Sequence, residues 1–284
     1  MYKEPKRIQI LVYLALILIA IFVLIPVWSL LNVAFDGSLR GAPVAFRLVP
    51  KEFSVASFLT AWQKPAQTLT FLGLLKNSLI VSLGSAIVAV IFGMSAAYAF
   101  ARYRFPGRHM GMTALLLGAL LPPVALMTPL YLLLSQLGIR TSLLGLMLAY
   151  TAFAMPFCVW NMRVAFQAVP QELEEAAFLD GASSWTAYWR VTLPLALPAI
   201  AVAALIAFLL GYTEFAIGWL FVDKPSTVTL AMAVSGMIRQ GSREWSDLAA
   251  LAVLMALPVV IIVLILRQYL LQGALPGVHI EERS

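Results

Sequence analysis

Long stretches without charged residues constrain this sequence more than any other feature. Residues 8–31 contain no Asp, Glu, Lys or Arg, and a transmembrane helix needs about 20 mostly apolar residues. Hydrophobic residues make up 62% of the chain and charged residues 11%, against about 25% charged in a soluble domain. Backbone groups inside lipid must find partners within their own segment, which favours helices. We therefore expect an all-α membrane protein.

Six segments have the length and composition of transmembrane helices. We place them at about 8–33, 77–101, 110–134, 143–165, 195–220 and 248–271, in a single transmembrane domain that covers residues 1–284. The first run is too long for the apolar part of a signal peptide, and no small-residue cleavage site follows it. It is therefore expected to be an uncleaved first helix. With six spans, both termini lie on the same side of the membrane.

Basic residues near the span ends predict the orientation. Cytoplasmic ends of transmembrane segments carry an excess of Lys and Arg. The basic residues Lys3, Lys6 and Arg7 precede the first span, and Arg102, Arg104 and Arg108 separate the second from the third. The facing loop at 135–142 has only one basic residue, although other expected outer loops hold several. The short loops thus predict cytoplasmic N- and C-termini.

Prolines interrupt several of these spans. Pro122, Pro123 and Pro129 lie in the third, Pro156 in the fourth and Pro258 in the sixth. Each proline lacks a backbone donor and frees a carbonyl, which is tolerated in a membrane where other helices or a wet cavity supply partners. The breaks suggest helices that move or line a path, and ordinary bundle packing is the alternative for any one of them.

The loop at 168–194 has the signals of two short helices. Pro170 suits a helix start, and Glu172, Glu174 and Glu175 suit the positive end of the helix dipole. Gly181 suits a left-handed helix stop. Ser183 or Ser184 is expected to cap a second helix, which is expected to end at Pro194. The aromatic residues of that helix, at i, i+3 and i+4, form one face and are Trp185, Tyr188 and Trp189.

The same loop resembles a known motif. Glu175-Ala176-Ala177 is followed at fixed spacing by Gly181, Val191 and Leu193-Pro194, and this is similar to the EAA motif of permease subunits of ATP-binding-cassette (ABC) importers, with valine for the usual isoleucine. Other stretches resemble the MalG-like, carbohydrate-type branch of that family. They are 77–79, 96–102, 104–108, 129–131 and 137–138. The resemblance covers most of the chain and is weakest at about 34–50.

The resemblance implies a type I ABC importer permease (MetI-like) fold in the cytoplasmic membrane of a bacterium or archaeon. It implies a transport subunit rather than an enzyme, which forms half of a path for a sugar, in particular a di- or oligosaccharide. A glycerol-3-phosphate-type or other small polar solute is the alternative. The implied partners are a second, MalF-like permease, two copies of an ABC ATPase, an extracytoplasmic solute-binding protein and membrane lipid. ATP and Mg²⁺ are then bound by the ATPase subunits, and this chain binds no cofactor or metal.

The resemblance also implies roles for residues of the loop. In this family the EAA loop forms coupling helices in a cleft of the ATPase. The implied coupling residues are Glu174, Glu175, Ala176, Ala177, Asp180 and Gly181. By position, Glu175 is the acidic contact to the ATPase and Gly181 is the bend between the two short helices. The other interpretation of the acidic residues is a solvated charged face.

Four residues are candidates for the substrate path. Glu214 lies in the fifth span, where a carboxylate is costly and a functional role is the default hypothesis. The alternative is a carboxylate near the outer interface, hydrogen-bonded between helices. The family often has Trp-Asn-Glu-Phe here, whereas this chain has Tyr212-Thr213 before the glutamate. Tyr131, Asn161 and Tyr212 either face a polar path or pack between helices.

Other functional classes fit the sequence less well. A net charge of +6 is explained by membrane topology and anionic lipid, so no nucleic-acid partner is expected. An intramembrane protease would need a Gly-x-Ser-x-Gly elbow or a His-Glu-x-x-His zinc motif, and the sequence has neither. It also lacks a nucleotide-binding P-loop. A stand-alone carrier remains the rival, although no internal repeat is evident.

Overall fold

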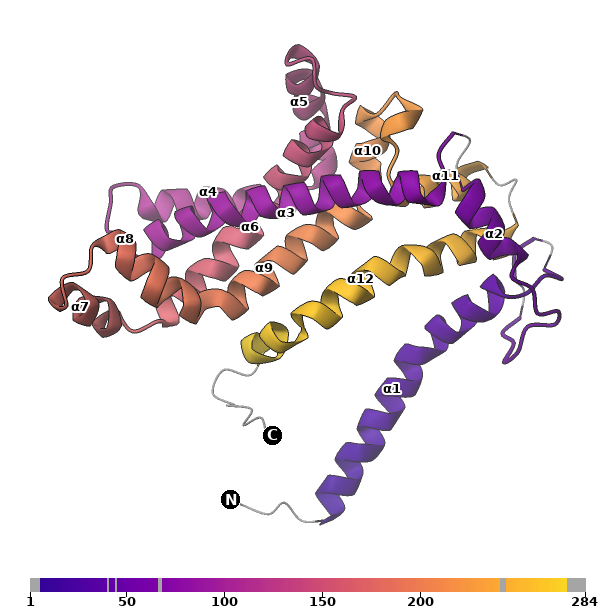
Figure 1. The fold of residues 1–284 in the computed structure, drawn as a ribbon, viewed down its shortest axis with the longest axis horizontal. Coiled ribbons are helices and arrows are strands. Elements are labelled where there is room, and N and C mark those ends of the chain that lie inside the picture. The colour runs from indigo at the N-terminus through magenta and orange to yellow at the C-terminus, as the bar shows by residue number, and fades with distance from the viewer. Residues whose placement is uncertain (1–5, 40, 44, 66–67, 241–243, 275–284) are drawn as a thin grey trace. The chain divides into compact units, whose positions relative to one another are not determined.

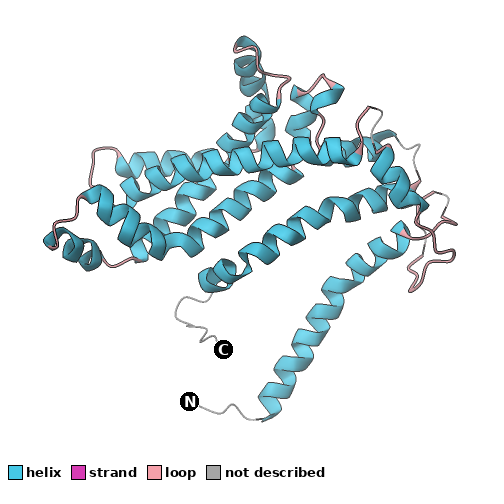
Figure 2. Ribbon diagram, viewed as in Figure 1, coloured by secondary structure: helices cyan, strands magenta, loops and turns pink. Residues whose placement is uncertain are grey.

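The computed structural model describes residues 6–39, 41–43, 45–65, 68–240 and 244–274, and within them the chain is helical (Figures 1 and 2). No β-strand occurs among these residues, which contain one isolated β-bridge, between Asp36 and Phe53. The prediction of an all-α protein is confirmed. The helices are α1 Lys6–Ala34, α2 Ala56–Gln63, α3 Phe71–Arg102, α4 Arg108–Leu120, α5 Pro123–Gln136, α6 Leu143–Ala168, α7 Gln171–Leu179, α8 Ser184–Ala187, α9 Leu193–Thr213, α10 Ala216–Phe221, α11 Leu230–Gln240 and α12 Trp245–Ala274.

Five helical segments in the described part of the chain are long and apolar enough to cross a membrane. They are Arg7–Ala34, Phe71–Arg102, Leu143–Ala168, Ser184–Thr213 and Trp245–Leu271. The pair formed by α4 and α5 has the composition of a sixth, but it is bent by 100° at a short break. The described residues therefore hold five candidate spans of a multi-pass membrane protein, or six if the bent pair counts as one.

Two adjacent prolines explain the bend in the expected third span. The backbone of Leu121 and Pro122 is extended, with ψ angles of 130° and 136°, because a residue before proline avoids the helical region. The amide of Leu121 still bonds the Leu117 carbonyl, whereas Pro122 and Pro123 have no N–H with which to continue the helix. The predicted segment 110–134 is thus two helices that diverge, as Figure 1 shows.

The expected fifth span is also interrupted. Its helix α9 ends at Thr213, and Glu214 has an extended backbone with ψ 131°. The short helix α10 then begins at Ala216, and the Glu214 carboxylate accepts the backbone N–H of Ile217 at 2.8 Å. The first N–H groups of a helix have no acceptor within the helix, and the carboxylate oxygen supplies one here. The predicted segment 195–220 therefore runs through two helices instead of one.

The chain divides into two compact units, which are described separately. One comprises residues 1–71 and 234–257, and the other residues 72–233 and 258–284. In the first unit, the segment after α1 is held by Asp36, whose carboxylate accepts the hydroxyl and amide of Ser38. The rings of Phe53 and Phe58 pack on Phe35, at centroid distances of 5.2 and 4.6 Å. The short helix α2 follows Phe53 and contains Phe58.

The second unit is a helical bundle built on close contacts. The helix α6 packs against α4 and α9, and small residues bring α3 close to its neighbours. A Cβ on Gly93 would lie 3.1 Å from the Cβ of Cys158 in α6, and one on Gly211 would lie 3.2 Å from the Cα of Ser82 in α3. Small residues allow such approach between membrane helices. Within this unit α7 and α8 lie at one end of the bundle, and α5 and α10 at the other (Figure 1).

Candidate functional site

The first helix of the predicted coupling loop, residues 168–194, is α7. Pro170 lies just before its first residue, with Glu172 and Glu174 in its first turn. At its end, the amide of Gly181 bonds the Phe178 carbonyl, and the amide of Ala182 bonds the Ala177 carbonyl. These two bonds form a Schellman stop, and Gly181 has the left-handed φ of +84° that this stop requires. The structure thus has the turn that the glycine predicted.

The second helix of the loop begins where expected but continues past its expected end. The hydroxyl of Ser183 accepts the amide of Thr186 at 3.2 Å and caps α8. A π-helical turn follows at Tyr188–Thr192 and leads directly into α9. Pro194 is the second residue of α9, which directly follows that turn. The expectation that Pro194 ends the helix is wrong, because the wider turn before it accommodates the proline.

One face of the coupling loop is exposed and carries most of the residues assigned to coupling. Glu175, Ala176, Asp180 and Gly181 are exposed, and Ala177 is partly buried. Beside them, Leu179 is 90% exposed at the tip of the loop. An exposed face that combines carboxylates, small residues and a large apolar side chain is typical of a protein contact surface.

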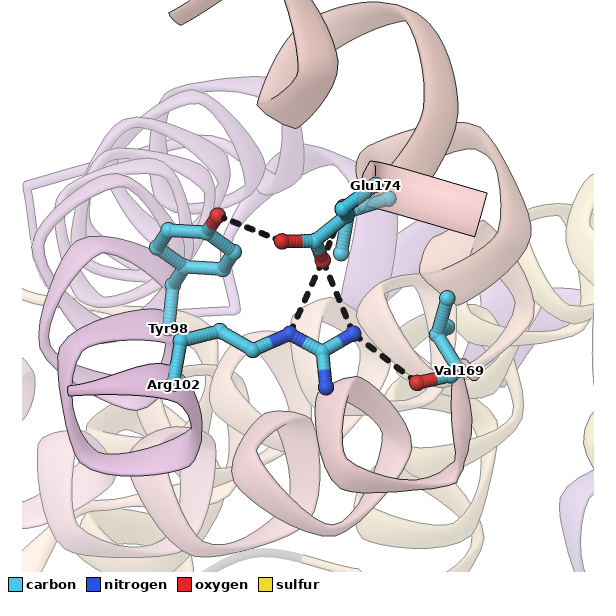
Figure 3. Close-up of polar contacts among 5 residues, drawn as sticks. Tyr98, Arg102, Val169 and Glu174 are labelled. Carbon is cyan, nitrogen blue, oxygen red and sulfur yellow. Dashed lines mark hydrogen bonds and ion pairs between the residues drawn. The ribbon is translucent and has the colours of Figure 1, made fainter. Parts of the chain in front are cut away.

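The opposite face of α7 is anchored through Glu174, which is 6% exposed. Its Oε1 atom lies 2.8 Å from both Nε and Nη2 of Arg102 and accepts the hydroxyl of Thr192 at 2.6 Å. Its Oε2 atom accepts the hydroxyl of Tyr98 at 3.1 Å. Arg102 also donates to the carbonyl of Val169 at 2.9 Å. Figure 3 shows this arrangement. We call these five residues the Glu174 cluster.

The Glu174 cluster satisfies a charge pair that is almost removed from solvent. The side chains of Arg102 and Glu174 are 7% and 8% exposed, and buried charges are tolerated only when paired and hydrogen-bonded. The ring of Tyr98 also packs edge-on against Tyr188 at 4.6 Å and Phe166 at 5.7 Å. The cluster therefore combines an ion pair with aromatic packing.

The sequence indicates other roles for two of these residues. Arg102 is a topology signal there, and Glu174 is one of the residues that the resemblance implies for coupling to the ATPase. The helical period could have indicated that Glu174 faces the bundle, because Glu174 and Ala177 lie three positions apart on one face of a helix. In the structure both are less exposed than Glu175.

Glu214 borders a cavity of about 490 Å³ at the α5 and α10 end of the bundle. The cavity lies among α4, α5, α6, α9 and α10, and its lining is mostly apolar, with Tyr150 and Glu214 as its polar side chains. The Tyr150 hydroxyl donates to the backbone carbonyl of Glu214 at 3.4 Å. Apolar walls with a few placed polar groups are typical of small-molecule sites.

Asn161 borders a second cavity of about 920 Å³. Its Oδ1 atom is buried and has no hydrogen-bond partner. This cavity extends along α6 to Val169, Pro170 and Leu173, at the start of the coupling loop. The same three residues, Ala119, Pro156 and Phe157, line both cavities, so the two cavities adjoin along α6.

The two tyrosines proposed for the path lie outside both cavities. Tyr212 is 1% exposed and its ring stacks on Phe208 at 5.2 Å. Tyr131 packs near Phe221, and the guanidinium carbon of Arg140 lies 4.8 Å from the centre of its ring. Arg140 also pairs with Asp223. The structure thus brings Glu214 and Asn161 to adjoining cavities and places the tyrosines in helix packing.

Comparison with known proteins gives a family match over most of the chain. Residues 89–275 match the family described as binding-protein-dependent transport system inner membrane component. The chain is 34% identical over 207 residues to the maltose/maltodextrin transport system permease protein MalG of Escherichia coli, covering 71% of this chain and 70% of MalG. It is 30% identical over 211 residues to the trehalose transport system permease protein SugB of Mycobacterium tuberculosis, covering 73% and 76%.

Solved structures match the fold. A chain from the crystal structure of a bacterial ABC transporter involved in import of the acidic polysaccharide alginate aligns with a TM-score of 0.72 at 20% identity. The alignment covers 95% of this chain and 99% of that one. A chain from an inward-facing structure of the MetNI methionine ABC transporter aligns with a TM-score of 0.57 at 20% identity, covering 68% and 93%. These likenesses agree with the expected permease fold.

Proposed function

The chain belongs to the family of binding-protein-dependent transport system inner membrane components, and from this we propose that it is the sugar-importing permease whose exposed coupling loop binds a separate ATPase. The observation that supports the loop's role is the division of α7 into two faces. Its exposed face presents Glu175, Ala176 and Asp180, while the other is held in the bundle by Glu174. A surface that must transmit force has to be both accessible and firmly attached.

The proposed assembly follows from the family. This chain pairs with a second permease of MalF type, and each of the two permeases is contacted by one copy of the ATPase. A solute-binding protein delivers the substrate from outside the cell. ATP and Mg²⁺ bind to the ATPase subunits, and we assign no cofactor or metal to this chain. The coupling loop and both termini then face the cytoplasm, in the orientation that the basic residues predict.

A neutral sugar is the solute class that we propose. The relatives named for maltose and trehalose support a sugar. Within the chain, Glu214 is the acidic side chain that lines the 490 Å³ cavity. A carboxylate at a largely apolar wall repels an anionic solute such as a glycerol phosphate ester, but it accepts hydrogen bonds from sugar hydroxyls. Asn161 is a polar residue in the lining of the adjoining cavity.

The ATPase contact is tested by a charge reversal at the exposed face. Glu175→Lys is expected to leave the chain folded and inserted but to abolish co-purification of the ATPase in detergent and sugar uptake in vesicles. The control is Glu52→Lys, which makes the same change at an exposed residue of the segment after α1. If wild-type protein never recovers an ATPase, or if Glu175→Lys transports normally, the proposed docking is wrong.

The solute class is tested separately in the reconstituted complex. Stimulation of ATP hydrolysis by the cognate binding protein is measured with maltose, trehalose and glycerol 3-phosphate as probes. Stimulation by at least one sugar and none by glycerol 3-phosphate supports the proposal. Stimulation by glycerol 3-phosphate alone would assign this permease to an anionic solute.

A further inference from the structure

The Glu174 cluster joins the coupling loop to three helical segments. We propose that Glu174 is a positioning residue through which movement of the ATPase reaches α3 and α9, by way of Arg102, Tyr98 and Thr192. This inference rests on the proposed function, because it takes the exposed face of α7 as the ATPase contact. It adds a role for the buried face, which is to transmit movement rather than to bind the ATPase.

Adjacent glutamates of α7 have separate surroundings. Successive residues of a helix point about 100° apart, so the side chains at 174 and 175 cannot share one environment. Glu175 is exposed, whereas the Glu174 side chain is 8% exposed and meets donors from other segments. The carboxylate of Glu174 is therefore out of reach of a partner protein that docks on the exposed face.

The donors to Glu174 come from segments that are far apart in sequence. Tyr98 and Arg102 lie in the last turn and a half of α3, 76 and 72 residues before the carboxylate. Thr192 lies in the π-helical turn that leads into α9. Arg102 also bonds the carbonyl of Val169, where α6 ends. A shift of α7 that preserves these bonds must displace the ends of all three helices.

The covalent connections of α7 are less able to transmit such a shift. On one side Val169 and Pro170 have extended backbones with ψ of 121° and 134°, and on the other the chain turns at Gly181. Rotation about these few dihedral angles lets a helix swing relative to its neighbours, as hinge residues do. Charge-assisted hydrogen bonds with little solvent access oppose that swing. The cluster is thus the stiff connection between loop and bundle.

The test separates transmission of movement from assembly. The complex with the second permease and the ATPase is purified, with Phe157→Cys as a reporter at the wall of both cavities and Cys158→Ala to remove the native thiol. The labelling rate by a maleimide is measured before and after trapping with ATP and orthovanadate. Hydrolysis of ATP and retention of the ATPase subunits are measured on the same samples.

Glu174→Gln keeps the shape of the side chain and removes its charge. In otherwise wild-type complexes, trapping is expected to change the labelling rate by about fivefold or more, the lower end of typical coupling energies. In Glu174→Gln complexes that change is expected to disappear, while the ATPase subunits are retained and ATP is still hydrolysed. The control is Glu52→Gln, the same change at an exposed residue of the segment after α1, away from the coupling loop, which is expected to respond like wild type.

A purely structural role predicts another result. Glu174→Gln would then lower the yield of complex, but the complexes that form would respond to trapping like wild type, and this would overturn the inference. If the single variant does not assemble, the double variant Glu174→Met with Arg102→Met is tested in its place. Replacing both members of the buried pair leaves no unpaired charge. A normal response in that variant overturns the inference, and a lost response supports it. Failure of the wild-type complex to retain an ATPase contradicts the proposed function itself.

Discussion

Two tyrosine hydroxyls beside the coupling loop differ in their hydrogen bonding. The Tyr98 hydroxyl donates to Glu174 at 3.1 Å, whereas the Tyr188 hydroxyl is buried without a partner. Tyr98→Phe is expected to destabilise the protein by about 1–3 kcal/mol, because a hydrogen bond to a charged group is lost. Tyr188→Phe is expected to be neutral or stabilising, since it removes an unsatisfied buried group. Thermal unfolding of the two variants in one detergent compares them, and equal losses would contradict the assignment.

Asp36 predicts a dependence of stability on pH in the unit that contains α1. Burial would raise the pKa of Asp36, but hydrogen bonds from Ser38 and from the backbone of Lys51 outweigh it and lower that pKa below its ordinary value. A lowered folded-state pKa contributes stability above the unfolded-state pKa, near 4, and that contribution is lost as pH falls through the folded-state pKa. Asp36→Asn is therefore expected to destabilise at pH 7 by about 1 kcal/mol.

The pH profile of unfolding checks this expectation. The difference in free energy of unfolding between wild type and Asp36→Asn should be constant from neutral pH down to about pH 5 and should shrink below about pH 4. A difference that persists unchanged in acid would show that the carboxylate charge is not what stabilises the segment after α1.

The residues that the motif singles out are exposed, whereas the buried ion pair beside them could not be predicted from the sequence. The motif singled out Glu175, Asp180 and Gly181, and the structure places all three on the exposed face of the loop. It could not show that Glu174 is buried against Arg102 and Tyr98, because pairing over 72 and 76 residues depends on how the helices pack. A single sequence carries no direct signal for such a pair.

At the scale of elements, the turn between α7 and α8 makes a direct prediction. A Cβ at position 181 would meet no atom within 4 Å, but the φ of +84° is unfavourable for any L side chain. Gly181→Ala is therefore expected to cost about 1–2 kcal/mol from backbone strain alone. Gly118→Ala is the control, because that glycine lies in α4, also with nothing within 4 Å, and alanine favours a helix. A destabilised control with an unaffected Gly181→Ala would refute the argument.

Proline positions explain both the successes and the errors at this scale. Pro122 and Pro123 indicated an interruption in the third span, and the 100° bend occurs there. Pro194 indicated an end that does not occur, because the π-helical turn at Tyr188–Thr192 precedes it. The position of a proline shows where a helix is weakened. The conformation of the neighbouring turn decides whether the helix bends, ends or continues there.

At the scale of the whole molecule, the second unit contains both the coupling loop and two adjoining cavities. The larger cavity reaches the first turn of α7, and the smaller one ends beside Glu214 at the other end of the bundle. Both are lined by Pro156 and Phe157 of α6. In the proposed function, the two adjoining cavities are this chain's half of the translocation path, and the second permease supplies the other half.

The central claim, that the coupling loop binds a separate ATPase, is tested most directly by cross-linking in the native membrane. Leu179 is 90% exposed at the tip of the loop, so Leu179→Cys in a Cys158→Ala background can be labelled with a thiol-reactive benzophenone. Illumination is expected to join the chain to a protein that mass spectrometry identifies as an ABC ATPase. The same label at Thr227→Cys, beyond α10, is expected to give no such product. Cross-linking of the ATPase from position 227 and not from position 179 would contradict the account.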